Sequence, residues 1–161
     1  MMRLIIIPFL CFALTACSQQ KAVIKKANAF YYVRTPGTVQ IDDRGNELPQ
    51  LRDTVFDVYL ESSIPMTVTK AWKNDKVYAV SAEAIKEATI NPEIHSGNEN
   101  EQQLKPSKGN FFYRLSLRNG EPSSAPQKLK SAEILLEINA ERKPFYYRVK
   151  QAKPVESPQF G

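Results

Sequence analysis

The sequence predicts an all-β protein folded as an antiparallel β-sandwich, and two observations indicate this class. Short runs rich in aromatic and β-branched residues recur along the chain, and turn residues separate them. The 161 residues include 11 prolines but only 6 glycines, and 10% of the residues are aromatic, which is typical of strands joined by many turns. None of the segments carries the sustained periodicity of an amphipathic helix.

The first expected strands surround a long connection. Residues 30–34 form a β-rich run that stops at a Pro-Gly bend and resumes over residues 38–41. A turn is expected at residues 42–46, where a glycine favours positive φ. Residues 54–60 alternate in character, so we expect a strand with one buried face. That face would consist of Phe56, Val58 and Leu60.

A tight hairpin is the clearest local prediction. Residues 67–73 and 76–80 flank the pair Asn74 and Asp75, and both turn residues tolerate the left-handed backbone that a two-residue hairpin needs. Residues 81–88 then form either a short helical turn or a continued strand.

Residues 91–110 are mostly polar and are expected to form a flexible loop, with disorder favoured because few apolar residues anchor it. The next strand covers residues 111–118 and is expected to end at Asn119 and Gly120.

A second hairpin joins residues 132–139 to residues 145–150 across residues 140–144, and the tail at 152–161 is expected to be extended. The count is then about seven strands, which favours an Ig-like β-sandwich. The Cys and Trp spacing of true immunoglobulin domains is absent. A small β-barrel is the alternative architecture.

The N-terminus carries the most specific signal of the sequence. Arg3 precedes an apolar run of about 11 residues, which closes on Leu14-Thr15-Ala16-Cys17. This run is too short for a spanning helix, which needs roughly 20 apolar residues. A charged start, a short apolar run and small residues before a cleavage point are typical of a signal peptide.

The ending Leu14-Thr15-Ala16-Cys17 resembles the lipobox of bacterial lipoprotein precursors. The resemblance implies cleavage between Ala16 and Cys17, acylation of the Cys17 thiol and attachment to a membrane. Ser18 follows in place of the Asp that usually retains such proteins at the inner membrane. An outer-membrane address, facing the periplasm, is therefore implied. An ordinary signal peptide with a chance cysteine is the alternative.

We expect four segments in the chain. Residues 1–16 would be the signal peptide and residues 17–28 the lipidated cysteine and its tether. Residues 29–151 would form the β-domain, and residues 152–161 its extended tail. The tether contains three lysines, which either contact anionic headgroups or belong to a solvated spacer. These lysines are Lys21, Lys25 and Lys26.

The polar side chains of the sequence offer few groups for catalysis or cofactor binding. His95 is the only histidine, and no glycine-rich phosphate loop or nucleophile elbow is present. The acidic turn at residues 42–47 is either a Ca²⁺ ligand set or a plain turn, and the plain turn is favoured because Arg44 opposes a cation. Cys11 leaves with the signal peptide, so no disulfide is expected. We therefore predict no enzyme, no metal and no cofactor. Export argues against nucleic-acid binding despite the net charge of +5.

Three aromatic triplets open expected strands, and neighbours in a strand point to opposite faces. One ring of each triplet would then face water or a partner. The expected outward rings are Tyr31, Phe112 and Tyr146, edged by Arg34, Arg114 and Arg148. Such a patch is a candidate protein-binding surface. Cross-strand aromatic pairing within the sheet is the alternative, and Trp72 is expected to fill the core.

Together these features predict a non-catalytic outer-membrane lipoprotein that binds a protein partner, such as an accessory subunit of an envelope or secretion assembly. A carrier that holds a lipid or glycan in an apolar cavity is the alternative. An enzyme acting on peptidoglycan is a weaker third hypothesis.

Overall fold

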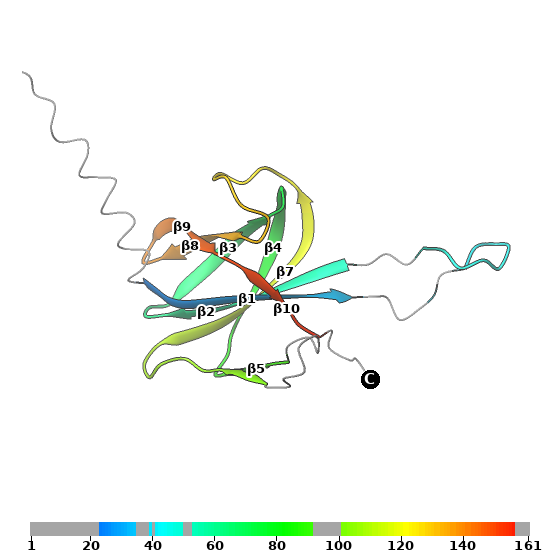
Figure 1. Ribbon diagram of the computed structural model, residues 1–161. Helices are drawn as coiled ribbons and strands as arrows, with labels where there is room; N and C mark the ends of the chain where they lie inside the picture. Colours follow the sequence, from blue (N-terminus) through cyan, green and yellow to red (C-terminus); the bar gives the residue numbers. More distant parts are fainter. Residues whose placement is uncertain (1–22, 35–38, 40, 50–52, 92–100, 157–161) are drawn as a thin grey trace, which may run out of the picture.

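The computed structural model confirms the all-β prediction (Figure 1). It describes residues 23–34, 39, 41–49, 53–91 and 101–156 of the 161. These residues form ten strands and no element of helix. The strands are β1 (Ile24–Arg34), β2 (Asp53–Ser62), β3 (Met66–Lys73), β4 (Lys76–Ala84), β5 (Ala88–Ile90), β6 (Gln102–Leu104), β7 (Phe111–Pro122), β8 (Ile134–Ala140), β9 (Lys143–Val149) and β10 (Ala152–Pro154). Within this part of the chain, no helix is long and apolar enough to cross a membrane.

Eight strands form one sheet in the order β10-β1-β2-β7-β4-β3-β8-β9, and the sheet curls into a half-barrel. This shape is compatible with both the predicted sandwich and the small barrel. The sheet is mixed rather than purely antiparallel, because β10 pairs with β1 in parallel. β10 follows β9 after two residues, so the chain passes from one edge of the sheet to the other.

Both predicted hairpins are present. Asn74 and Asp75 have φ values of 49° and 55°, as expected for a two-residue turn between β3 and β4. The turn between β8 and β9 is tighter than predicted, because only Glu141 and Arg142 separate the strands, with φ values of 49° and 61°.

The main core fills the concave face of the sheet. Its largest fully buried side chains come from β2, β7 and β8, and include Val58, Leu60, Leu115, Ile134, Leu136 and Ile138. A smaller second core lies on the convex face, where the separate β5–β6 hairpin covers part of the sheet. Its members are Phe30, Tyr59, Ile90, Leu104 and Phe112. β2 is therefore buried on both faces, and the prediction of a single buried face was wrong.

Several predicted boundaries shift. β1 begins at Ile24, so residues 24–28 belong to the sheet rather than to the tether. Residues 81–84 continue β4, as one of the two alternatives proposed. β7 continues past Asn119 and Gly120 to Pro122. The register of its pairing with β4 shifts at a bulge there, where Asn119 has a φ of 53°.

Residues 101–110, in the second half of the expected flexible loop, contain a strand and contacts with the sheet. Residues 102–104 form β6, and Leu104 is buried in the second core. Residues 107 and 110 bond to the buried carboxylate of Glu61. The rest of that predicted loop, residues 92–100, lies outside the described residues.

The strand register defines two ends of the curled sheet. At the entry end, where the chain enters β1, Ile24 pairs with Ser62 and Ser62 pairs with Phe111. At the arm end, β1 leaves the sheet where Arg34 pairs with Asp53. We call the described residues 39 and 41–49 of the β1–β2 connection the arm, and Figure 1 shows it projecting away from the sheet.

Candidate functional site

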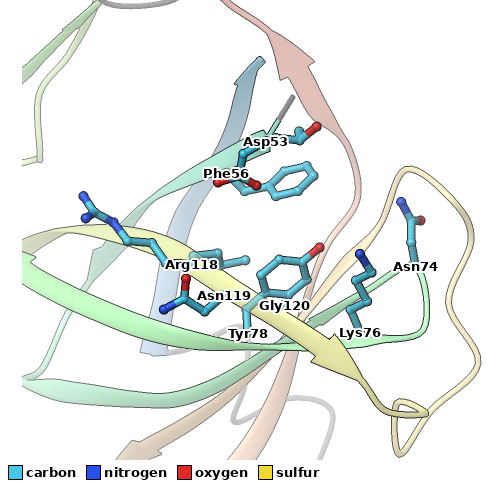
Figure 2. A pocket seen from close by; sticks show the side chains of 10 residues that line it. Asp53, Phe56, Asn74, Lys76, Tyr78, Arg118, Asn119 and Gly120 are labelled. Carbon is cyan, nitrogen blue, oxygen red and sulfur yellow. The ribbon is translucent and has the colours of Figure 1, made fainter. Parts of the chain in front are cut away.

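A pocket of about 300 Å³ opens at the arm end of the sheet (Figure 2). Three elements line it: the start of β2, the β3–β4 hairpin and the bulged end of β7. The lining residues are Asp53, Thr54, Phe56, Asn74, Lys76, Tyr78, Leu117, Arg118, Asn119 and Gly120. The figure shows the guanidinium of Arg118 pointing away from the Tyr78 phenol, so Lys76 supplies the cation on the Tyr78 side.

Tyr78 shapes this pocket by its contacts with Phe56 and Gly120. Its ring meets that of Phe56 edge-to-face, with the centroids 5.9 Å apart. A Cβ at Gly120 would lie 2.6 Å from Tyr78 Cε1, so only glycine allows the ring to rest there. Burial, with a smaller contribution from the Asp53 carboxylate, raises the pKa of Tyr78 above its ordinary value of 10.0.

Lys73 closes the main core beside this pocket. Only 5% of the residue is exposed, and its Nζ donates to the Ser131 carbonyl oxygen at 2.7 Å. The ammonium also lies 5.3 Å from the Phe56 ring centroid, within cation–π range. Burial lowers the pKa of Lys73. Lys73 is the cross-strand partner of Lys76, so two cations stand opposite each other next to the hairpin turn.

A second hollow of about 500 Å³ lies on the other side of the same hairpin, against residues 124–131. Arg148 holds this segment by donating to the Gln127 side chain at 3.3 Å and to the Lys128 carbonyl oxygen at 3.2 Å. Arg148 also pairs with Glu133 at 3.5 Å. Its contacts with this segment therefore give Arg148 a structural role.

The arm carries most of the exposed apolar side chains. The large exposed hydrophobic residues of the described chain are Val33, Val39, Ile41, Leu48 and Phe111. Val39, Ile41 and Leu48 belong to the arm, and Val33 lies at its base in β1. Ile41 is 65% exposed. These residues were missed as candidates, although apolar side chains around a polar turn were a visible signal.

The turn at the arm tip is ordered by its own acidic residue. Asp42 accepts hydrogen bonds from the Asn46 backbone, the Asn46 side chain and the Arg44 backbone, at 2.8, 3.1 and 2.9 Å. These bonds, those of Asn46 foremost, lower the pKa of Asp42. The carboxylate is thus engaged by N–H donors, as in the plain turn that the sequence favoured. Throughout the described residues, no three His, Cys, Asp or Glu side chains gather to hold a metal ion.

The three predicted outward rings do not form a patch. Tyr31 is half-buried on the main core, with its ring centroid 6.1 Å from that of Phe56. Phe112 is buried in the second core, on the opposite face of the sheet. Tyr146 packs edge-to-face on Trp72 at 6.1 Å, far along the sheet order from Phe112. The prediction of one exposed aromatic surface was wrong.

The arginines expected to edge that surface serve separate pairs. Arg34 pairs with Asp53 at 3.3 Å near the arm, where both side chains are exposed. Arg114 pairs with the buried Asp57 at 2.7 Å, and Ser116 donates to the same carboxylate at 2.7 Å. Only Arg34 therefore lies next to the arm.

Cross-strand aromatic pairing, the alternative interpretation, is what the structure contains. Phe30 meets Tyr59 edge-to-face at 5.8 Å, and Tyr59 stacks on Phe112 at 6.1 Å. The three rings cross β1, β2 and β7 beneath the β5–β6 hairpin. Trp72 is buried as predicted, but it packs outside the two apolar clusters, beside Tyr146.

Cys17, His95 and the cleavage point at Ala16 lie outside the described residues. Comparison of the chain with models of known families, with curated proteins and with solved structures gave no match.

Proposed function

We propose that this chain is a lipid-anchored lipoprotein of the bacterial outer membrane that binds a protein partner without catalysing a reaction. The anchor is the Cys17 thiol, and the binding element is the arm. An accessory subunit of an envelope assembly is the protein class that combines these two features.

The exposure of apolar side chains on the arm carries the proposal. Ile41 is 65%, Val39 47% and Leu48 42% exposed, on a segment that leaves the sheet. Exposed apolar side chains that gather on one segment are typical of an interaction site. A partner that covers these side chains would gain a binding free energy of roughly 25 cal/mol for each Å² of apolar surface removed from water.

The position of the anchor supports the same assignment. Ile24 begins β1 seven residues after Cys17, so the sheet starts within about 25 Å of the lipidated sulfur. The arm leaves from the other end of β1, at Arg34. A protein held at its entry end would therefore present the arm away from the bilayer.

Two experiments test the proposal. Mass spectrometry of the protein purified from membranes should show a diacylglyceryl group on Cys17. In Cys17→Ser that group should be absent, and high salt should release the protein from the membranes. An unmodified sulfur would overturn the anchor.

The binding role is tested by placing a photo-crosslinking amino acid at residue 41 or 48 in intact cells. We expect one discrete protein adduct from both positions. The matched control is the same amino acid at Phe111, an exposed apolar position at the entry end, which should not give that adduct. Equal adducts at all three positions, or none, would overturn the role of the arm.

The carrier remains a second candidate because the pocket at the arm end, at about 300 Å³, matches the lower size of ligand cavities, although its lining is mostly polar in place of the apolar lining predicted. Native mass spectrometry distinguishes the two functions. A carrier should retain a lipid or glycan, and Gly120→Val should release it by displacing Tyr78. A binding module should show the mass of the protein alone.

A further inference from the structure

The entry end of the sheet carries an excess of positive charge. Four connections meet there: β2–β3, β4–β5, β6–β7 and β8–β9. Two of the lysines at this end are neutralised, since Lys26 pairs with Glu61 at 3.3 Å and Lys105 pairs with Glu87 at 3.0 Å.

Five further cations at this end have no such partner. Within the described residues, no ion pair or hydrogen bond engages the side chains of Lys25, Lys86, Lys108, Arg142 and Lys143. Glu141 is the one carboxylate in these connections that is likewise unpaired. The arm end differs, because Asp42, Asp43, Glu47 and Asp75 accompany its lysines and arginines.

Phe111 adds an exposed aromatic ring to this basic surface. It is the first residue of β7, and 41% of it is exposed although the strand buries Phe112 and Leu115. Pro65, in the β2–β3 connection, is exposed as well. Aromatic side chains beside lysines and arginines are typical of surfaces that lie at the interface of an anionic bilayer.

The segment that carries Lys108 and Phe111 is held in place. Glu61 Oε1 accepts hydrogen bonds from the Ser107 backbone at 2.9 Å and from the Asn110 side chain at 2.6 Å. Because Glu61 belongs to β2, the turn between Ser107 and Asn110 is fixed to the sheet. Lys108 and Phe111 are therefore presented by a preorganised turn.

We propose that the entry end is a docking surface for a bilayer containing anionic phospholipid, with the cations on headgroup phosphates and Phe111 at the acyl boundary. This inference deepens the proposed function, since the lipid at Cys17 would bring this end to the membrane. Charge complementarity and the short connection from Cys17 to Ile24 both favour a lipid surface as the occupant. Docking would orient the domain with the arm pointing outward.

The test uses the chain from residue 17 onward with Cys17→Ser, because every described strand lies after that residue. Co-sedimentation with vesicles should show binding to phosphatidylcholine mixed with phosphatidylglycerol and little binding to phosphatidylcholine alone. Added salt should weaken the binding, because it screens exposed charges.

Replacing Lys108 and Lys143 with Gln should weaken binding about 25-fold, since each cation near an anionic surface contributes about five-fold. The matched control, Lys128→Gln with Lys130→Gln, removes the same charge at the arm end and should leave binding unchanged. Phe111→Ser should weaken vesicle binding even at high salt. Under that condition the two double-lysine variants should bind like the unsubstituted protein, because salt screens the charges they remove. Circular dichroism verifies that each variant is folded.

Equal binding to both vesicle types, or equal losses in the two double-lysine variants, would overturn the docking surface. Its failure is separable from failure of the anchor. Vesicle binding here is measured without lipidation, whereas the mass of Cys17 tests the anchor alone.

Discussion

The aromatic ring of Tyr78 occupies the space that a side chain at Gly120 would need, with 2.6 Å between Tyr78 Cε1 and the position of a Cβ. Gly120→Ala should therefore displace Tyr78 and lower the free energy of unfolding by about 1–3 kcal/mol, the usual cost of overpacking. Urea denaturation measures this cost. In a Tyr78→Ala background the same substitution should cost much less, because no ring remains to be displaced. Equal costs in both backgrounds would contradict the contact.

The carboxylate of Glu61 should make stability depend on pH. Burial alone would raise its pKa, but the Asn110 and Ser107 hydrogen bonds and the Lys26 ammonium lower it from 4.5 to about 2. A lowered pKa stabilises the fold above the unfolded value, so this contribution is present above pH 4.5 and is lost as the pH falls toward 2. It is on the order of 3 kcal/mol.

Urea denaturation across this pH range tests the assignment. Glu61→Gln should remove much of the acid-induced loss of stability, while Glu83→Gln, at an exposed position of β4, should leave it intact. An unchanged pH profile in Glu61→Gln would assign the loss to other carboxylates.

Two Asp–Arg pairs of the same chemistry should contribute different amounts to the free energy of unfolding, because their burial differs. Asp57→Asn removes the partner of Arg114 at a site where the aspartate side chain is 9% exposed, and it should cost about 2 kcal/mol. Asp53→Asn removes the partner of Arg34 where both side chains are more than half exposed, and it should cost at most about 0.5 kcal/mol. Chemical denaturation of the two variants provides the comparison, and similar costs would contradict it.

Leu104 should hold the β5–β6 hairpin onto the convex face of the sheet. Leu104→Ala removes a side chain that is 8% exposed in the second core, and we expect a loss of about 2 kcal/mol. Native-state hydrogen exchange should show slow exchange at those amides of residues 102–104 that donate to β5, with that protection lost in the variant. Rapid exchange at these amides in the unmodified protein would favour the flexible loop that the sequence predicted.

Local patterns predicted the parts of the fold that depend on neighbouring residues. Asn74 and Asp75 specify their hairpin because few residue pairs tolerate two positive φ values in succession. In β7, Tyr113, Leu115 and Leu117 alternate with polar residues and all three lie on the main core, so here too a local pattern is enough to mark the concave face.

The features that depend on distant contacts were not predictable in this way. Nothing near Tyr59 or Phe112 in the sequence indicates that Ile90 and Leu104 cover them. The triplet that contains Tyr31 has an aromatic residue for either face, so its pattern does not say which ring points to the main core. Phe111 lies two residues before Tyr113 and so belongs to the concave face of β7, but it lies beyond the end of the core and is exposed.

The two ends of β1 also bear on mechanics. Ile24 and Arg34 are the termini of one 11-residue strand, with the N-terminal segment attached to the first and the arm to the second. A pulling force applied between these two attachments runs along the covalent backbone of that strand. The hydrogen bonds to β2 and β10 need not resist it, so tension in this direction can be borne without unravelling the sheet.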